Sequence, residues 1–94
     1  METVRVSPNF VLAAANMEMT KAAKSSDELY RLMTIDYINS QTGLDVATEV
    51  KTHLMKAHDL LDLVDTPDAK ATQLGIAAAI GRQDMIIRKI ELSI

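Results

Sequence analysis

Cysteine is absent from this sequence. The chain can therefore form no disulfide, no thiolate nucleophile and no cysteine-ligated metal centre, and nothing indicates an oxidising compartment. The N-terminus lacks the basic start of a signal peptide, and no uncharged run approaches the roughly 18 residues that a membrane span needs. We expect a soluble, cytoplasmic protein with no membrane span.

Aromatic residues are scarce too, because Phe10, Tyr30 and Tyr37 are the only ones. Since 48% of the residues are nonetheless hydrophobic, the core must consist of Leu, Ile, Val, Ala and Met, a composition that suits closely packed helices. Signals for β-strands are thin. The sequence predicts a single all-α domain over residues 1–94, a small helical bundle with residues 1–7 as a flexible arm.

Positive charge is not clustered. The net charge is −3, and only Arg82, Arg88 and Lys89 lie close together. Binding to nucleic acid phosphates depends on clustered lysine and arginine, so we expect no nucleic acid partner. No serine stands in a sharp strand-to-helix turn near a histidine. We therefore expect no enzymatic activity, no catalytic residue, no cofactor and no metal site.

The two prolines mark the starts of helices. Pro8 and Pro67 each follow a serine or threonine that can cap the first turn, and proline suits the first helical position. Residues 25–28 match a capping box, which predicts a restart or a bend, and Gly43 suits the left-handed position after a helix. The sequence thus predicts three to four helices. Their expected bounds are about residues 8–24, 26–40, 44–64 and 67–92.

The helix expected over residues 67–92 has two apolar faces. The first face repeats at alternating spacings of four and three residues, as in a coiled-coil seam, and consists of Ile76, Ile80, Gln83, Ile87, Ile90 and Ile94. The second face is turned by roughly 160° from the first, and consists of Leu74, Ala78, Gly81, Met85 and Leu92. Glycine inside a helix costs about 1 kcal/mol relative to alanine. Because Gly75 and Gly81 lie in this helix, we expect another backbone to approach it closely.

The helix expected over residues 44–64 carries the most regular apolar stripe in the chain. The stripe keeps the three-four spacing and consists of Ala47, Val50, Leu54, Ala57, Leu61 and Val64. The link to the last helix is short, so the two helices must form an antiparallel C-terminal hairpin. The residues that we expect to be buried together are Leu54, Leu61, Ile80 and Ile87.

The helix expected over residues 8–24 also has apolar residues on two sides. One set is Phe10, Ala14 and Met17, and the other is Leu12, Ala15, Met19 and Ala22. A lone chain of this length has too few helices to cover the surplus faces of both its first and last helix. The sequence therefore favours a non-enzymatic protein–protein interaction or assembly module, a homo-oligomer or a binder of another protein, that associates through the second face. A compact monomer in which residues 8–24 pack between the helices expected over residues 26–40 and 67–92 is the alternative.

Acidic residues concentrate in the third expected helix, since residues 44–65 contain five acidic and two basic side chains. Those off the stripe are Asp45, Glu49, Asp59 and Asp62. We expect a solvated surface there, with an acidic inhibitor of a basic binding site as an alternative. In the last helix, Arg82 and Lys89 follow one boundary between the two faces, and Asp84 and Glu91 follow the other.

Asp36 falls inside the apolar face expected for residues 26–40. A carboxylate in such a place needs a hydrogen bond, or burial raises its pKa. The expectation is that Asp36 either has a buried partner or lies at a rim that reaches solvent.

His53 and His58 flank the apolar stripe on opposite sides. Five residues apart on a helix, they cannot share a metal ion, and no further ligands stand out. Residues 53–57 resemble the phosphoacceptor segment of histidine phosphotransfer domains, in which a lysine follows an exposed histidine by three positions, although Ala57 stands where glycine is usual. This resemblance implies a regulatory alternative in which His53 accepts phosphate and Lys56 stabilises its charge.

Overall fold

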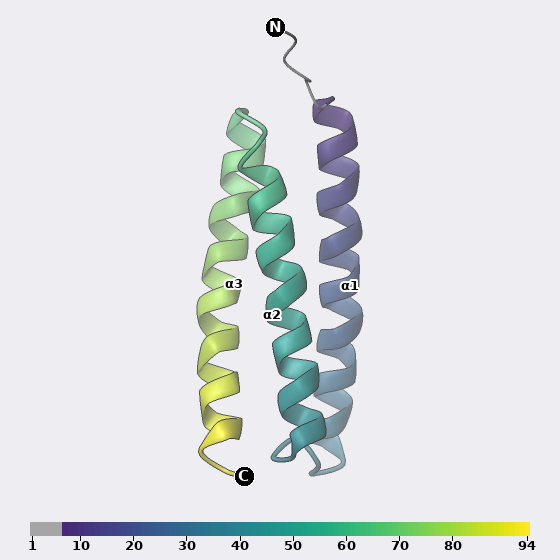
Figure 1. The fold of residues 1–94 in the computed structure, drawn as a ribbon, viewed down its shortest axis with the longest axis vertical. Helices are drawn as coiled ribbons and strands as arrows, with labels where there is room; N and C mark the ends of the chain where they lie inside the picture. Colours follow the sequence, from purple (N-terminus) through teal and green to yellow (C-terminus); the bar gives the residue numbers. More distant parts are fainter. Residues whose placement is uncertain (1–6) are drawn as a thin grey trace, which may run out of the picture.

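The protein, in a computed structural model that describes residues 7–94, is built of helices alone over that range. The helices are α1 (Pro8–Thr34), α2 (Gln41–Leu61) and α3 (Pro67–Glu91). Links at residues 35–40 and 62–66 reverse the chain direction twice, so each helix runs antiparallel to the next (Figure 1). The all-α prediction is confirmed, with three helices. Residues 1–6 of the predicted arm lie outside the described residues.

The helices predicted over residues 8–24 and 26–40 are one continuous helix, α1, which corrects the prediction of a break. The capping-box residue Glu28 does not cap a new helix but pairs with Arg31 one turn ahead, at 2.6 Å. Leu29, the residue after Glu28, is buried in a cluster with side chains of α2 and α3. Burial of this turn stabilises the uninterrupted helix more than a local cap stabilises a restart.

α1 ends at Thr34 because the chain there adopts a Schellman motif. Asp36 has a φ of 58°, in the left-handed region, which aspartate tolerates better than most residues. Its N–H donates to the carbonyl of Met33 at 3.1 Å, and the N–H of Tyr37 donates to that of Leu32 at 2.7 Å, the two bonds that define the motif. The side chain of Asp36 is exposed. Asp36 therefore lies after the helix and not within its apolar face, which corrects that placement, while its exposure agrees with the alternative of a position that reaches solvent.

Gly43 lies in the first turn of α2 and not, as the sequence predicted, after the end of a helix. Ser40 caps the helix, and its Oγ accepts the N–H of Gly43 at 3.0 Å. No glycine of the described residues has a positive φ, so Gly43 does not end a helix. It is instead buried against the backbone of Ile38, whose carbonyl group would overlap an added Cβ. Glycine allows the 35–40 link to fold back tightly onto the start of α2.

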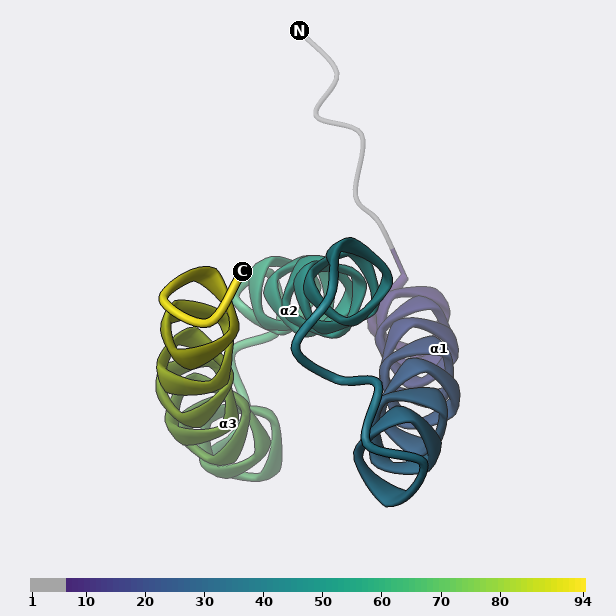
Figure 2. The same cartoon turned by 90° about the horizontal axis from the view of Figure 1, so that it is seen from below.

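α2 is the central helix and packs against both neighbours (Figure 2). No α-carbon of α1 lies within 8 Å of one of α3, so the three helices form an arch that is open on one side. The alternative in which the first helix lies between the others does not hold. The radius of gyration is 15.4 Å, whereas a compact domain of this length would have about 12 Å.

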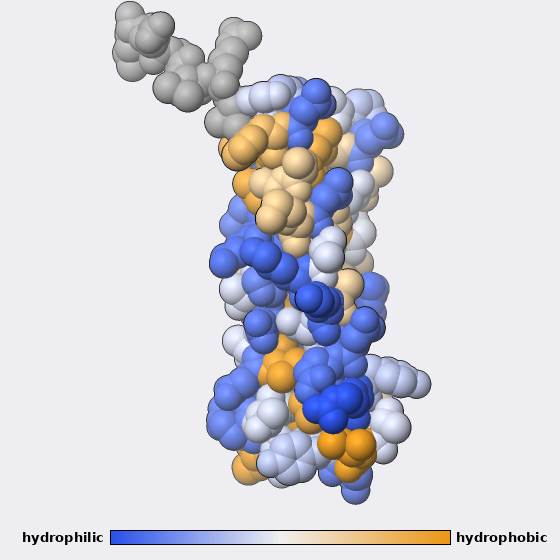
Figure 3. Space-filling view, turned by 90° about the vertical axis from the view of Figure 1, so that its right-hand side faces the viewer, coloured by the Kyte–Doolittle hydropathy of each residue, from blue (hydrophilic) through white to orange (hydrophobic). Residues whose placement is uncertain are grey.

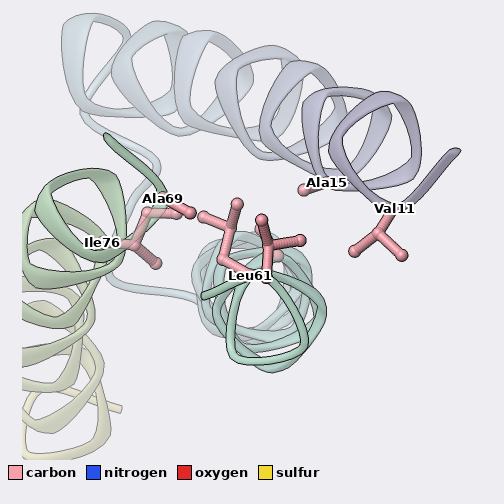
Figure 4. Packing of buried hydrophobic residues seen from close by; sticks show 7 residues of the cluster. Val11, Ala15, Leu61, Ala69 and Ile76 are labelled. Carbon is pink, nitrogen blue, oxygen red and sulfur yellow. The ribbon is translucent and has the colours of Figure 1, made fainter. Parts of the chain in front are cut away.

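Two clusters of buried side chains stabilise the arch, one toward each end. The first joins all three helices (Figure 4) and contains Val11, Ala15, Ala57, Leu61, Val64, Ala69 and Ile76. The second also joins all three helices and contains Leu29, Ala47 and Ile90. Among the residues predicted to be buried together, Leu61 is buried, while Leu54 and Ile80 pack partly buried against the first cluster and Ile87 against the second.

The first face of α3 packs on α2 over most of its length. Its buried members are Ile76, Gln83 and Ile90. Two glutamines cross this seam: Gln83 Nε2 donates to the carbonyl of Ala47 at 3.0 Å, and Gln73 Nε2 donates to that of His58 at 3.2 Å. Both glutamines are largely buried, so a shift along the helix would leave their amides unpaired at a considerable cost. They specify the antiparallel register of the pair.

Candidate interaction site

The second face of α3 is directed away from α2, and neither of the other two helices in the described part of the chain covers it. Its large residues are 74% (Leu74), 72% (Met85) and 81% (Leu92) exposed, and Ala78 and Gly81 are exposed as well. A depression of about 560 Å³ lies along its C-terminal half, where the apolar parts of Met85, Ile86 and Leu92 meet the stems of three basic side chains. Exposed apolar patches with polar rims commonly mark surfaces that bind other molecules.

The glycines of α3 have open space beside them. Among residues 7–94, nothing lies within 4 Å of a Cβ added to Gly75 or Gly81. The close backbone approach expected there does not occur inside the molecule. The surface around Gly81 is thus flat and accessible to a second helix from outside.

Opposite charges flank the second face. Arg82 and Lys89, seven residues apart, form its basic edge, and neither is in an ion pair with a described residue. Asp84 and Glu91, also seven apart, form its acidic edge. Asp84 lies 2.6 Å from the Nζ of Lys51 on α2. The acidic edge therefore adjoins α2, and the basic edge adjoins the open side of the arch.

The open side of the arch contains an apolar groove, the α1–α3 groove, that sequence reasoning missed. Val50 and Leu54 of α2 contribute to its floor, α1 and α3 form its walls, and its two stretches measure about 480 and 330 Å³. Among its lining residues, only Arg82 and Lys89 carry charge. Wall residues such as Ala23 are too short to meet across the space. Ala79 and Ile86 of α3, which belong to neither predicted face, line the groove and were the sequence signal that could have revealed it.

The surface of α1 is apolar in part. Of its two predicted sets, Leu12, Ala15, Met19 and Ala22 are covered at least partly by the rest of the chain. Phe10 and Met17 of the other set are largely exposed, and Val11, which neither set included, is buried. Viewed from the α1 side, apolar side chains gather near the upper end, with smaller groups toward the lower end (Figure 3).

His53 connects α1 with α2. Its Nδ1 lies 2.8 Å from Oε1 of Glu18, and its Nε2 lies 3.9 Å from Oε1 of Glu49. The side chain is only 16% exposed, whereas Lys56 is exposed. A phosphoacceptor histidine needs an accessible nitrogen and a nearby cation. Carboxylates lie near both nitrogens, and this geometry does not favour the phosphotransfer alternative.

The contact between Glu18 and His53 is expected to affect stability in acid. The hydrogen bond from His53 holds the pKa of Glu18 below its ordinary value of 4.5. A carboxylate whose pKa is lower in the folded state stabilises the fold above its unfolded pKa, and that contribution disappears as the pH falls through the folded pKa. Urea unfolding from neutral pH downward should therefore show a smaller acid-induced loss in Glu18→Gln than in the parent.

Glu49→Gln is the matched control, because Glu49 is more exposed and lies farther from the ring. Its acid-induced loss of stability should equal that of the parent. An equal loss in all three proteins would mean that Glu18 and His53 do not interact in solution.

The acidic residues of α2 and of its C-terminal cap, Asp62, lie at the surface. The exposed ones are Asp45, Glu49, Asp59 and Asp62. Asp62 accepts a hydrogen bond from Gln73 Nε2 at 3.1 Å, and this bond, with the charge of Lys70, lowers the pKa of its carboxyl group. Asp62 therefore helps to hold α2 against α3. Nothing in the contacts of the others distinguishes a docking site from a solvated surface.

In comparisons with known proteins, no protein-family model, no curated protein and no solved structure matches the chain. Among residues 7–94, no set of three or more histidine or acidic side chains is arranged to hold a metal ion. In the same part of the chain, none of the helices combines the length and the apolar character that crossing a membrane requires.

Proposed function

We propose that this protein is a non-enzymatic interaction or assembly module, which associates with copies of itself or with another protein through apolar helix faces that its own fold leaves uncovered. The observation that carries the proposal is the exposure of the second face of α3. In this arch α3 has one neighbouring helix, α2, which covers only the first face. The proposal includes a cytoplasmic location and a homo-oligomeric state.

Burial of the second face supplies the driving force. Each square ångström of apolar surface removed from water contributes about 25 cal/mol, and three of the five residues are large apolar side chains that are more than two-thirds exposed. Ala78 and Gly81 lie between them and allow a second helix to approach closely. A helix with large apolar residues on either side of small ones is well shaped for such contact.

Two substitutions on the second face are expected to abolish association. Met85→Glu would bury a charge in the contact, and Gly81→Leu would place a bulky side chain at the closest approach. Sedimentation of the parent over a dilution series should show species larger than one 10.3 kDa chain. Both variants should sediment as single chains at every concentration.

Met55→Glu is the matched control, since Met55 is an exposed methionine on α2. It should associate as the parent does, and circular dichroism should show equal helix content in all variants. If Met85→Glu and Gly81→Leu stay folded and keep the solution mass and the partner binding of the parent, the second face is merely exposed to solvent and the proposed function is wrong.

A further inference from the structure

The α1–α3 groove and the second face of α3 are complementary in shape and charge. The groove is a concave apolar channel whose only charged lining residues are Arg82 and Lys89. The second face is an exposed apolar stripe bordered by Asp84 and Glu91. Both pairs of charges have the same spacing of seven residues, about 10 Å along a helix. One molecule therefore carries both halves of a possible contact.

We infer that the α1–α3 groove of one copy receives the second face of α3 from another copy, which completes a four-helix bundle. This inference rests on the proposed function and names the partner of the second face. The added helix would lie beside both α1 and α3, as the fourth helix of an up-down-up-down arrangement does. It would cover the groove and the second face in a single contact.

Charge selects the direction of the added helix. When two neighbouring helices are antiparallel, corresponding edges of their apolar stripes meet, whereas in a parallel pair opposite edges meet. On the side of α3 that lines the groove, Arg82 and Lys89 border one edge of the apolar stripe. On the second face, Asp84 and Glu91 border the corresponding edge. An antiparallel helix therefore brings acids to bases, and a parallel one brings bases to bases.

One register satisfies both ion pairs. If Arg82 lies opposite Glu91 of the second copy, Lys89 lies opposite Asp84 of that copy, because the spacings are equal and the directions opposed. Leu92 of the second copy then lies at the level of Arg82, in the stretch of the groove lined by Met19, Ala23 and Leu54.

The other large residue of the stripe is accommodated in the same register. Met85 of the second copy lies at the level of Arg88, and there the groove is lined by Leu29, Met33 and Ile38. Both large side chains in the C-terminal half of the second face thus meet apolar stretches of the groove.

The contact is heterologous, because the groove and the second face are different surfaces. A symmetric pair of copies that each placed α3 in the groove of the other would bring the Arg82 and Lys89 edges of both together, with like-charge repulsion. Each copy instead offers one groove and one second face, so association continues from copy to copy into a rod or a ring.

Mixing two defective variants tests this arrangement. Ala23→Arg blocks the groove at an exposed alanine of its wall and leaves the second face intact, while Met85→Glu alters the second face and leaves the groove intact. Each variant alone should sediment as one chain. An equimolar mixture should form a complex of two chains and nothing larger, whereas the parent forms larger species.

A charge swap tests the register. Arg82→Glu should weaken association by about tenfold or more, since it sets like charges opposite each other, and so should Glu91→Arg. The double variant restores the pair in swapped form and should recover most of the parent's association. Failure of the double variant to recover would overturn the inferred register.

The inference and the proposed function fail in different ways. If Ala23→Arg associates as the parent does while Met85→Glu does not, the second face binds something other than the groove; the inference is then wrong and the proposed function stands. If the parent is a single chain at all concentrations, a second copy is not the occupant and the inference is wrong. If Met85→Glu and Gly81→Leu change neither mass nor partner binding, both fail.

Discussion

Leu61→Ala is expected to lower the free energy of unfolding by about 2 to 5 kcal/mol, the range for a buried leucine truncated to alanine. Leu61 is 2% exposed and lies in the larger of the two buried clusters, to which all three helices contribute. Its side chain points among Val11, Ala69 and Ile76 (Figure 4). A cavity there would loosen α1 and α3 from α2 together. Urea unfolding followed by helical circular dichroism measures the loss.

Leu54→Ala is the matched control within the same stripe. Leu54 is only partly buried and lines the floor of the α1–α3 groove, so its truncation should cost about half as much as that of Leu61 or less. Both should be measured at low protein concentration, because association would add apparent stability. If both substitutions lowered the free energy of unfolding equally at high dilution, Leu54 would be as buried as Leu61. The description of the α1–α3 groove as open would then be wrong.

Gly43→Ala is the second substitution with a large expected effect, a loss of about 1 to 3 kcal/mol or more. An added Cβ would overlap the carbonyl group of Ile38, and the backbone cannot yield as a flexible side chain does. The N–H of Gly43 also donates to Ser40 Oγ. A backbone shift that relieves the overlap with Ile38 would therefore disturb this capping hydrogen bond as well.

Gly75→Ala is the matched control, since the same substitution meets open space in α3. It should raise the free energy of unfolding by about 0.5 to 1 kcal/mol, the gain in helix propensity. A Gly43→Ala protein as stable as the parent would show that the 35–40 link does not fold back onto α2 as described.

The starts of α1 and α3 were predictable because proline and capping groups act within one turn, although Ser7 makes no side-chain cap bond before Pro8. The start of α2 at Gln41 was predicted three residues too late, at residue 44. Thr66 accepts the N–H of Ala69 at 3.2 Å and Pro67 occupies the first turn, as the sequence indicated. The end of α1 was not predictable in the same way. Asp36 ends it through a left-handed backbone, and aspartate is less distinctive there than glycine. The capping-box pattern at residues 25–28 predicted a helix restart that does not occur, because burial of Leu29 stabilises the continuous helix more than the cap would stabilise a new one.

The candidate site was predictable only in part. The second face follows from residue spacing on one helix, and its exposure agrees with the expectation that α2 occupies the first face alone. The groove involves Ala23 of α1, Leu54 of α2 and Ile86 of α3, and no local pattern connects three helices. For the same reason, the partial burial of Leu54 could not be distinguished from the full burial of Leu61.

Periodicity and capping are local, so the residue order alone specifies α2, α3, the stripe that joins them and the short link that makes them antiparallel. The absence of contact between two helices, in contrast, depends on how all three helices pack in the folded chain. α1 and α3 both pack on α2, and the short side chains between them, such as Ala23 and Ala79, cannot fill the remaining space. The arch, its groove and the exposed second face therefore arise from packing, because they depend on side-chain volumes summed over all three helices.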